Sequence, residues 1–156
     1  MFNHFEPSLL KFLKDLQANN NRDWFNDHKQ QYEDHVRLPA LAFIEQMDQW
    51  IRLISPHYEA SPKKVGGSLM RIYRDVRFSK NKLPYKTNLG IQFRHEVGKD
   101  VHAPGFYLHI AADEIFLAVG TWQPDRDPLA AIRNHIVTKP GPYLDAIEHE
   151  PFTQFY

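Results

Sequence analysis

"FYLHIAADEIFLAVGTW", residues 106–122, is the stretch that decides the fold class. Two apolar runs, 106–110 and 115–122, flank the residues 111–114, and this arrangement predicts two strands joined by a tight turn. Strands linked by so short a connection pair antiparallel. The apolar content of both runs favours a central place for this hairpin in its sheet.

The segment upstream extends the sheet. "TNLGIQFRH", residues 87–95, alternates polar with apolar side chains, and so does the beginning of "RIYRDVRFSKNKLPYKTN", residues 71–88. We expect a strand over 70–78 and a loop over 79–86. The expected strand has an apolar face and a polar face, formed by Met70, Ile72, Val76 and Phe78 and by Arg71, Tyr73, Asp75 and Arg77. Arg74 breaks the alternation, so either the strand ends near it or Arg74 is half-buried against an acid such as Asp75.

The first third of the chain predicts helices over 7–18, 23–36 and 38–54, because apolar residues recur there at helical spacing. Asn21 or Asp23 is expected to cap the second of these helices.

Beyond the hairpin, Asp127 and Pro128 suit the start of another helix, which would turn Leu129, Ile132 and Ile136 inward. A further short helix is expected after Pro142.

Strands linked by hairpins, with helices before and after them, indicate an α+β fold. We expect an N-terminal helical layer, residues 1–54, packed on a largely antiparallel sheet within 66–122, with one or two C-terminal helices within 127–150. At 156 residues and 42% hydrophobic composition, the chain is expected to form a single domain.

The composition excludes several classes of chemistry. The chain has no cysteine, and therefore no disulfide, thiolate metal site or cysteine nucleophile. Its nine histidines show no metal-site spacing, since His28 and His35 lie about two helical turns apart, so no metal site is expected. No P-loop or G-x-S-x-G motif is present, and the residues name no cofactor. Without a membrane-spanning run or a secretory signal pattern, we expect a cytoplasmic location and no membrane partner.

The charge pattern draws attention to the middle of the chain. The net charge is zero, but residues 61–94 carry nine basic and one acidic residue, whereas 1–60 carry six and nine, and 95–156 carry four and nine. Such a distribution focuses positive potential on a local patch. Surface ion pairs contribute only about 0 to 1 kcal/mol each, so stability alone is a weak reason to gather six bases in 71–88.

We therefore interpret this patch as an anion-binding site, in which Arg supplies a planar fork and Lys a mobile charge. The candidate ligand-binding residues are Arg71, Tyr73, Arg74, Arg77, Lys82, Tyr85, Lys86, Asn88, Tyr107, His109 and Trp122. Alternatives stay open: the bases pair with acids and only orient the loop, His109 is a solvated strand histidine rather than an acid or base, and Trp122 fills the core rather than stacking on a ligand.

The motifs "NNRDWF", "RDVRFSKNKLPYKTN", "PGFYLHI" and "VGTWQPD" resemble the DUF2461 family over nearly the whole chain. The positions that match the family motifs are Trp24, Phe25, Arg71, Arg74, Asp75, Arg77, Phe78, Lys82, Pro84, Tyr85, Lys86, Tyr107, Gly120 and Trp122. The resemblance implies no established biochemical role. It also implies a further C-terminal segment, which we expect this chain to lack.

Three hypotheses of function follow. The chain binds a small phosphorylated or carboxylated ligand through the basic segment; or it binds single-stranded nucleic acid along the same bases; or the motif is structural and the protein acts through a partner surface. Zero net charge makes nucleic acid the weaker of the two binding hypotheses. Whether the protein is an enzyme stays open.

Overall fold

Helices α1 (Pro7–Ala18) and α4 (Leu38–Ile54) have the bounds that their apolar spacing predicts. The computed structural model of the chain describes residues 2–96 and 104–154. α1 carries a proline in its first turn and buries Leu9, Phe12, Leu13 and Leu16, whereas α4 buries Ala40, Ile44 and Ile51. Both helices contribute to one hydrophobic core.

The predicted single helix over 23–36 is wrong, because three shorter elements replace it: α2 (Arg22–Asp27), α3 (Lys29–Tyr32) and the π-helix η1 (Glu33–Arg37). The interruption lies at His28, whose φ and ψ of −107° and 13° are not helical. Its Nδ1 lies 2.8 Å from the carbonyl oxygen of Trp24, and its ring stacks on the indole at 4.1 Å. The side chain of Asn21 caps α2 by accepting from the backbone N–H of Trp24, as expected.

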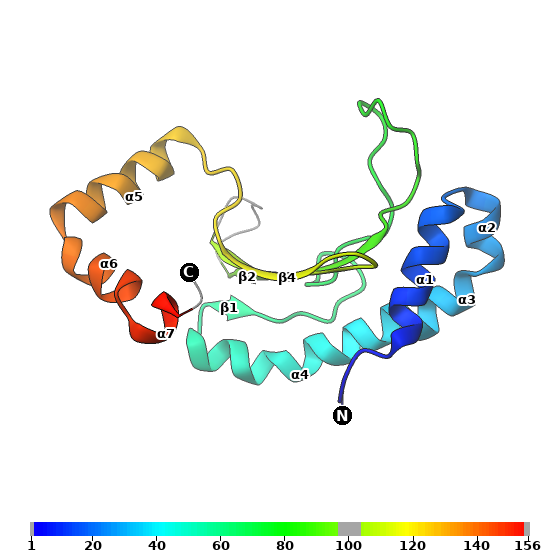
Figure 1. Cartoon of the computed structure of the whole chain (residues 1–156), viewed down its shortest axis with the longest axis horizontal. Coiled ribbons are helices and arrows are strands. Elements are labelled where there is room, and N and C mark those ends of the chain that lie inside the picture. Colours follow the sequence, from blue (N-terminus) through cyan, green and yellow to red (C-terminus); the bar gives the residue numbers. More distant parts are fainter. Residues whose placement is uncertain (1, 97–103, 155–156) are drawn as a thin grey trace. The chain divides into compact units, whose positions relative to one another are not determined.

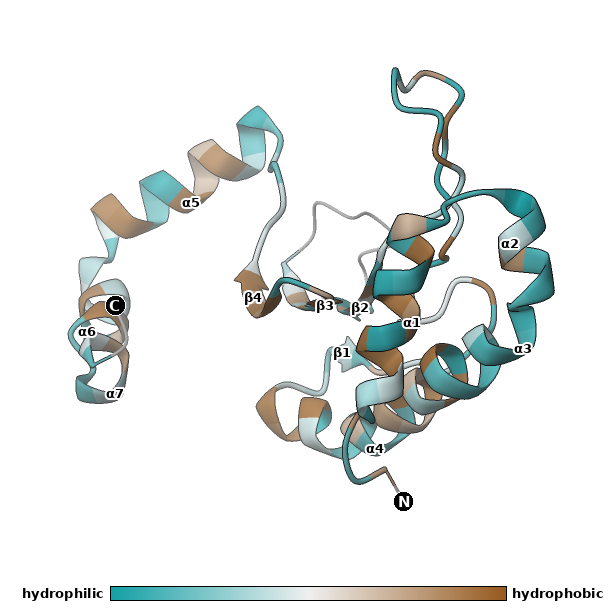
Figure 2. Ribbon diagram, turned by 45° about the vertical axis from the view of Figure 1, so that its right-hand side comes forward, coloured by the Kyte–Doolittle hydropathy of each residue, from teal (hydrophilic) through white to brown (hydrophobic). Residues whose placement is uncertain are grey.

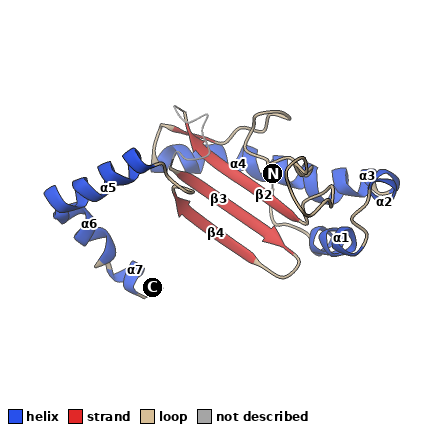
Figure 3. Ribbon diagram, turned by 90° about the horizontal axis from the view of Figure 1, so that it is seen from above, coloured by secondary structure: helices blue, strands red, loops and turns tan. Residues whose placement is uncertain are grey.

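A four-stranded antiparallel sheet lies next along the chain, in the order β1 (Tyr58–Glu59), β2 (Asn88–His95), β3 (Gly105–Ala111) and β4 (Ile115–Gly120) (Figure 3). This confirms the α+β class and the predicted hairpin; residues 97–103 of the expected sheet region lie outside the described residues. The hairpin is not central, however, because β4 is an edge strand. Its Ile115, Leu117 and Val119 are 62%, 64% and 68% exposed, and β4 is mostly hydrophobic in Figure 2.

The two faces of the sheet differ in chemistry. Leu89, Ile91 and Phe93 of β2 are buried in the core with the helices of the same unit, which lie on one side of the sheet (Figure 1). On the other face, Gly90 pairs with His109 and Gln92 pairs with Tyr107. We call this second surface the polar face.

The predicted strand over 70–78 is wrong. In the described chain, the β pairing of residues 69–87 is limited to two isolated bridges. One joins Leu69 to Ile91, and the other joins Tyr73 to Tyr85. A strand needs a continuous partner, and the returning segment contains Pro84, which has no N–H to donate. Phe78, expected on the buried face, is 95% exposed.

Residues 71–86 therefore form a loop, here called the basic loop, which projects from the body of its unit (Figure 1). We call residues 71–74 and 84–86 its stem and residues 75–83 its tip.

Residues 122–156 form a second compact unit, separate from residues 1–121. It contains α5 (Arg126–Thr138), α6 (Pro140–Ile147) and α7 (Glu150–Thr153). The N-cap residue of α5 is Asp125 and not Asp127. Within this unit Leu129 and Ile136 are half-buried, and the inward face of α5 stays a prediction. The single-domain expectation stays a prediction. No described helix has both the length and the apolar character needed to cross a membrane.

Candidate functional site

The side-chain carboxamide of Asn20 joins the basic loop to the helical layer through two hydrogen bonds. Asn20, at the turn between α1 and α2, donates from Nδ2 to the carbonyl oxygen of Tyr85 at 3.0 Å, and its Oδ1 accepts from the N–H of Tyr85 at 3.1 Å. The carboxamide thus pairs with the peptide groups of Tyr85 much as a neighbouring strand would. The ring of Tyr85 also stacks on Phe25 at 4.1 Å and is only 4% exposed. Tyr85, a predicted ligand-binding residue, therefore packs the stem against the helices.

Two of the three cations of the tip, Arg77 and Lys82, are hydrogen-bonded within the tip. Arg77 donates from Nε and Nη2 to the two carboxylate oxygens of Asp75, at 3.0 and 2.6 Å. These hydrogen bonds lower the pKa of Asp75. Lys82 donates to the carbonyl oxygens of Val76 and Arg77, at 2.9 and 3.4 Å. Neither Arg77 nor Lys82 joins the convergent cluster that the sequence predicted.

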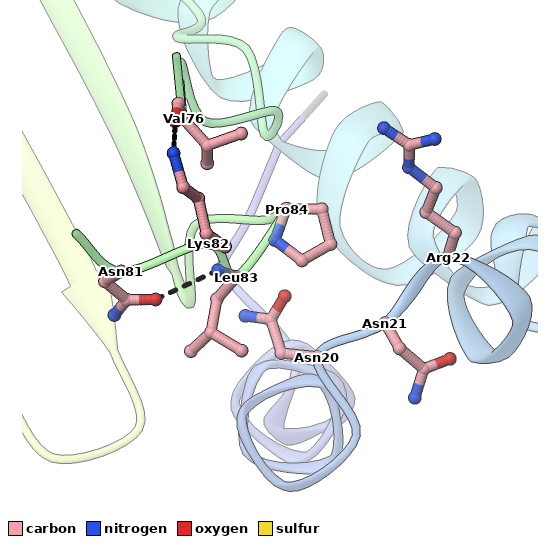
Figure 4. A pocket seen from close by; sticks show the side chains of 8 residues that line it. All are labelled: Asn20, Asn21, Arg22, Val76, Asn81, Lys82, Leu83 and Pro84. Carbon is pink, nitrogen blue, oxygen red and sulfur yellow. Dashed lines mark hydrogen bonds between the residues drawn. The ribbon is translucent and has the colours of Figure 1, made fainter. Parts of the chain in front are cut away.

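A shallow hollow of about 520 Å³ lies between the tip and the turn that follows α1 (Figure 4). Its lining residues are Asn20, Asn21, Arg22, Val76, Asn81, Lys82, Leu83 and Pro84. Most of their polar side chains already have partners, since Asn21 caps α2, Asn81 accepts from the N–H of Leu83, and Lys82 caps carbonyl groups. Arg22 and Lys82 do not point toward one another in Figure 4. The hollow therefore does not present paired cations to an anion.

The cations of the stem are different. Arg71, Arg74 and Lys86 make no side-chain hydrogen bond or ion pair within residues 2–96 and 104–154. Arg74 is half-buried but is not paired with Asp75, which binds Arg77 instead. Lys86 is half-buried as well; burial lowers the pKa of its amino group, and the positive charge of Arg71 lowers that pKa further. The charge of Arg71 also contributes to the lowered pKa of Asp75, but neither Arg71 nor Lys86 has a hydrogen-bonded counter-ion in the described chain.

A second group of predicted site residues converges on the polar face. The hydroxyl oxygen of Tyr107 lies 3.0 Å from Nδ1 of His109, and Nδ2 of Asn88 lies 3.5 Å from that hydroxyl and 3.4 Å from the same ring nitrogen. The ring of His109 stacks on Phe116 at 4.8 Å, which fixes its plane. Burial raises the pKa of Tyr107, while the hydrogen bond from Asn88 opposes that shift.

Gly90 lies beside this cluster and beside Met70, the residue that precedes the stem. A Cβ atom at residue 90 would lie 3.1 Å from the hydroxyl oxygen of Tyr107 and 3.2 Å from the sulfur of Met70. The missing side chain therefore leaves room for the phenol of Tyr107 and for Met70, the residue before Arg71. Asn88 follows Lys86 by two residues on the other side of the stem. The candidate site consists of the stem cations Arg71 and Lys86 and the cluster of Asn88, Tyr107 and His109.

The other predicted residues lie elsewhere. Tyr73 is 51% exposed and packs edge-on against Phe25, whereas Trp122 belongs to the second unit. Asn20 and Gly90 are not among the residues that the sequence predicts for the site. The Asn19–Asn21 run was a signal for a turn, but nothing in it indicated a partner 65 residues away. In the described parts of the chain, no three His, Asp or Glu side chains converge as metal ligands.

Comparison with known proteins agrees with the resemblance seen in the motifs. A family model described as conserved hypothetical protein (DUF2461) matches residues 8–156, so the chain belongs to the DUF2461 family. No curated protein and no solved structure matches the chain. The description of the family assigns no activity, and a functional proposal must therefore come from the site.

Proposed function

We propose that the protein binds a small phosphorylated or carboxylated ligand at the stem of the basic loop. Arg71 and Lys86 supply the positive charge, and Asn88 and Tyr107 supply neutral hydrogen-bonding groups. The observation that carries the proposal is the half-buried amino group of Lys86, which lies near Arg71 and has no acidic partner in the described chain.

The free energy of this arrangement favours an anion. Burial disfavours the charged form of a lysine, and a neighbouring like charge disfavours it further. Leaving a buried charge without a partner is strongly unfavourable in proteins, whereas an opposite charge at hydrogen-bonding distance offsets that penalty. Since Arg71 offers a planar fork suited to two oxygens of one phosphate or carboxylate group, a single anionic group can satisfy both cations.

The size of the charged surface favours a small ligand over a polymer. A nucleic acid requires a stripe of cations along its backbone, but Arg77 and Lys82 are engaged within the tip. What remains at the stem suits one anionic group. Tyr85, a predicted stacking residue, is buried and has no face open to a base.

The proposal is tested by adding inorganic sulfate or phosphorylated metabolites and measuring the shift in unfolding temperature. Sodium chloride at equal ionic strength is the reference, because it separates specific binding from screening. We expect a saturable rise in the wild type, and its loss in Lys86→Met and Arg71→Gln. Lys80→Met is the matched control, since it removes an exposed lysine of the tip. An equal loss in Lys80→Met, or a full response in Lys86→Met, would contradict the proposal.

One observation favours a second candidate function, single-stranded nucleic-acid binding by the tip. Phe78 is 95% exposed, and Cζ of Arg77 lies 5.9 Å from the centre of its ring. An exposed aromatic ring among cations suits stacking on a base. A mobility-shift assay with single-stranded oligonucleotides at low salt tests it: the candidate requires binding by the wild type and a loss in Phe78→Ala.

A further inference from the structure

His109 and Tyr107 have a hydrogen-bond geometry that simple anion binding does not require. Nδ1 of His109 faces the hydroxyl of Tyr107 at 3.0 Å, and Nε2 faces a carboxylate oxygen of Glu114 at 4.0 Å. Stacking on Phe116, with a ring angle of 7°, holds the imidazole between these two groups. The side chain of His109 is 19% exposed, so it is within reach of solvent protons.

The direction of the Tyr107 hydrogen bond depends on the charge of His109. A neutral imidazole has one ring nitrogen that donates and one that accepts. With its proton on Nε2, toward Glu114, the ring accepts the phenol proton at Nδ1, and the hydroxyl of Tyr107 points inward. When the ring takes up a proton from solvent, Nδ1 carries a hydrogen and donates to the phenol oxygen. The phenol proton must then turn away from His109.

The groups around the phenol agree with this switch. Asn88 lies 3.5 Å from the phenol oxygen and has only donors on its Nδ2, so it cannot accept the displaced proton there. The charged or titratable groups that face the imidazole are Tyr107 on β3 and Glu114 in the turn before β4, while β2 contributes the neutral Asn88 and β4 contributes Phe116.

We propose that Tyr107 is a hydrogen-bond donor to the bound anion, and that protonation of His109 turns the hydroxyl outward to make this bond. This inference rests on the proposed function of the stem. It follows that anion binding is coupled to the uptake of a proton by His109. The site therefore binds its ligand more tightly in mildly acidic solution than in mildly alkaline solution.

Sulfate is a suitable probe because it stays a dianion across the pH range in which histidine titrates. Its affinity is measured from the rise of the unfolding temperature with sulfate concentration, between pH 5.5 and pH 8.0, at constant ionic strength. We expect the wild type to bind sulfate about tenfold more tightly at pH 5.5, roughly the value of one charge-assisted hydrogen bond. His109→Gln keeps a polar partner for Tyr107 without the titration, and should lose this difference relative to the wild type. Tyr107→Phe should bind as weakly at pH 5.5 as the wild type does at pH 8.0.

The control is His57→Gln, which removes a histidine paired with Glu96 near the far end of β2 and should keep the pH dependence of the wild type. A pH dependence that persists in His109→Gln, or an unchanged affinity of Tyr107→Phe at pH 5.5, overturns the inference and leaves the stem site standing. If the wild type binds sulfate at no pH, the proposed function fails and this inference fails with it. Urea unfolding of each variant without sulfate establishes that it is folded, and His109→Asn serves if the Gln variant is not.

Discussion

The stem and the tip of the basic loop carry three cations each, but they use them differently. In the tip, Arg77 pairs with Asp75 and Lys82 caps two carbonyl groups. In the stem, neither Arg71 nor Lys86 has such a partner in the described chain. A run of bases in sequence is therefore not a unit in space, and the function of each base depends on what its neighbours leave unpaired.

Asp75 explains the difference. It is the single acid among residues 61–94, and Arg77, two residues away, takes both of its carboxylate oxygens. Arg71 and Arg74 lie 15 and 12 residues from Lys86 in sequence, and the surroundings of these cations are set by the sheet and by α1 and α2 rather than by the loop. Arg77 of the tip therefore has an acidic partner two residues away, whereas no cation of the stem has a hydrogen-bonded acid in the described chain.

The largest expected effect is a loss of stability when the buried aromatic ring of the stem is removed. Tyr85→Ala removes a ring that is 4% exposed and stacked on Phe25, and we expect a loss of about 3 to 5 kcal/mol in the free energy of unfolding. Urea unfolding followed by tryptophan fluorescence measures it. Tyr73→Ala, in the same aromatic cluster but 51% exposed, is the matched control and should lose clearly less. Equal losses in both variants would show that the stem is not anchored by Tyr85.

The next effect concerns the carboxamide that joins the stem to the helices. Asn20→Ala removes two hydrogen bonds to the part-buried backbone of Tyr85, and we expect a loss of about 1 to 3 kcal/mol. Asn81→Ala removes one hydrogen bond in the exposed tip and should cost much less in the same urea experiment. An Asn20→Ala variant as stable as the wild type would mean that the stem holds its position without this contact.

The sequence predicts the elements whose periodicity coincides with burial. Helices α1 and α4 and strand β2 fall in this group, because each packs one apolar face on the common core. The alternation of residues 70–78 resembles that of β2, but pairing is a property of two segments, and in the described chain residues 70–78 form one bridge, between Tyr73 and Tyr85. Apolar content likewise failed to reveal that β4 is an edge strand, since nothing in one strand states how many neighbours it has.

The same limit applies to the site. Tyr107 and His109 lie two residues apart on one strand, so alternation alone places them on one face. Their meeting with Asn88 depends on the register of β2 and β3, which pairs Asn88 with Ala111. The contact of Asn20 with Tyr85 spans 65 residues and depends on how the helices pack. Local pattern predicts which residues share an element, and tertiary packing decides which elements meet.

Lys86→Met tests the cost of the unpaired stem charge in the absence of ligand. We expect the variant to be as stable as the wild type or more stable by roughly 1 kcal/mol at neutral pH, because the half-buried charge is removed while the aliphatic chain is kept. The pKa of Lys86 is lowered in the folded state, so the unfolded chain binds more protons between that pKa and the ordinary value. The wild type should therefore gain stability relative to Lys86→Met as the pH rises through the alkaline range.

Urea unfolding at a series of pH values from 7 to 10 measures this difference. Lys80→Met, at the exposed tip, should show no such divergence from the wild type. A Lys86→Met variant that is strongly destabilised at neutral pH would indicate that Lys86 stabilises the fold. It would support the hypothesis that the basic motif is structural and does not bind a ligand.

Arg77→Gln should have the smallest effect, and it decides whether stem and tip act separately. The pair of Arg77 with Asp75 is exposed, with 76% of the arginine side chain open to solvent, and such pairs contribute little to stability in water. We expect no measurable change in the unfolding midpoint or in sulfate affinity at neutral pH.

The local consequence of Arg77→Gln is a rise in the pKa of Asp75, because the hydrogen bonds that lower it are lost. In the wild type the pair stabilises the ionised carboxylate, and this small contribution to stability disappears as the pH falls through the lowered pKa of Asp75. An NMR titration of the Asp75 carboxyl group detects the change, while a loss of sulfate affinity equal to that of Lys86→Met would show that the whole loop acts as one site.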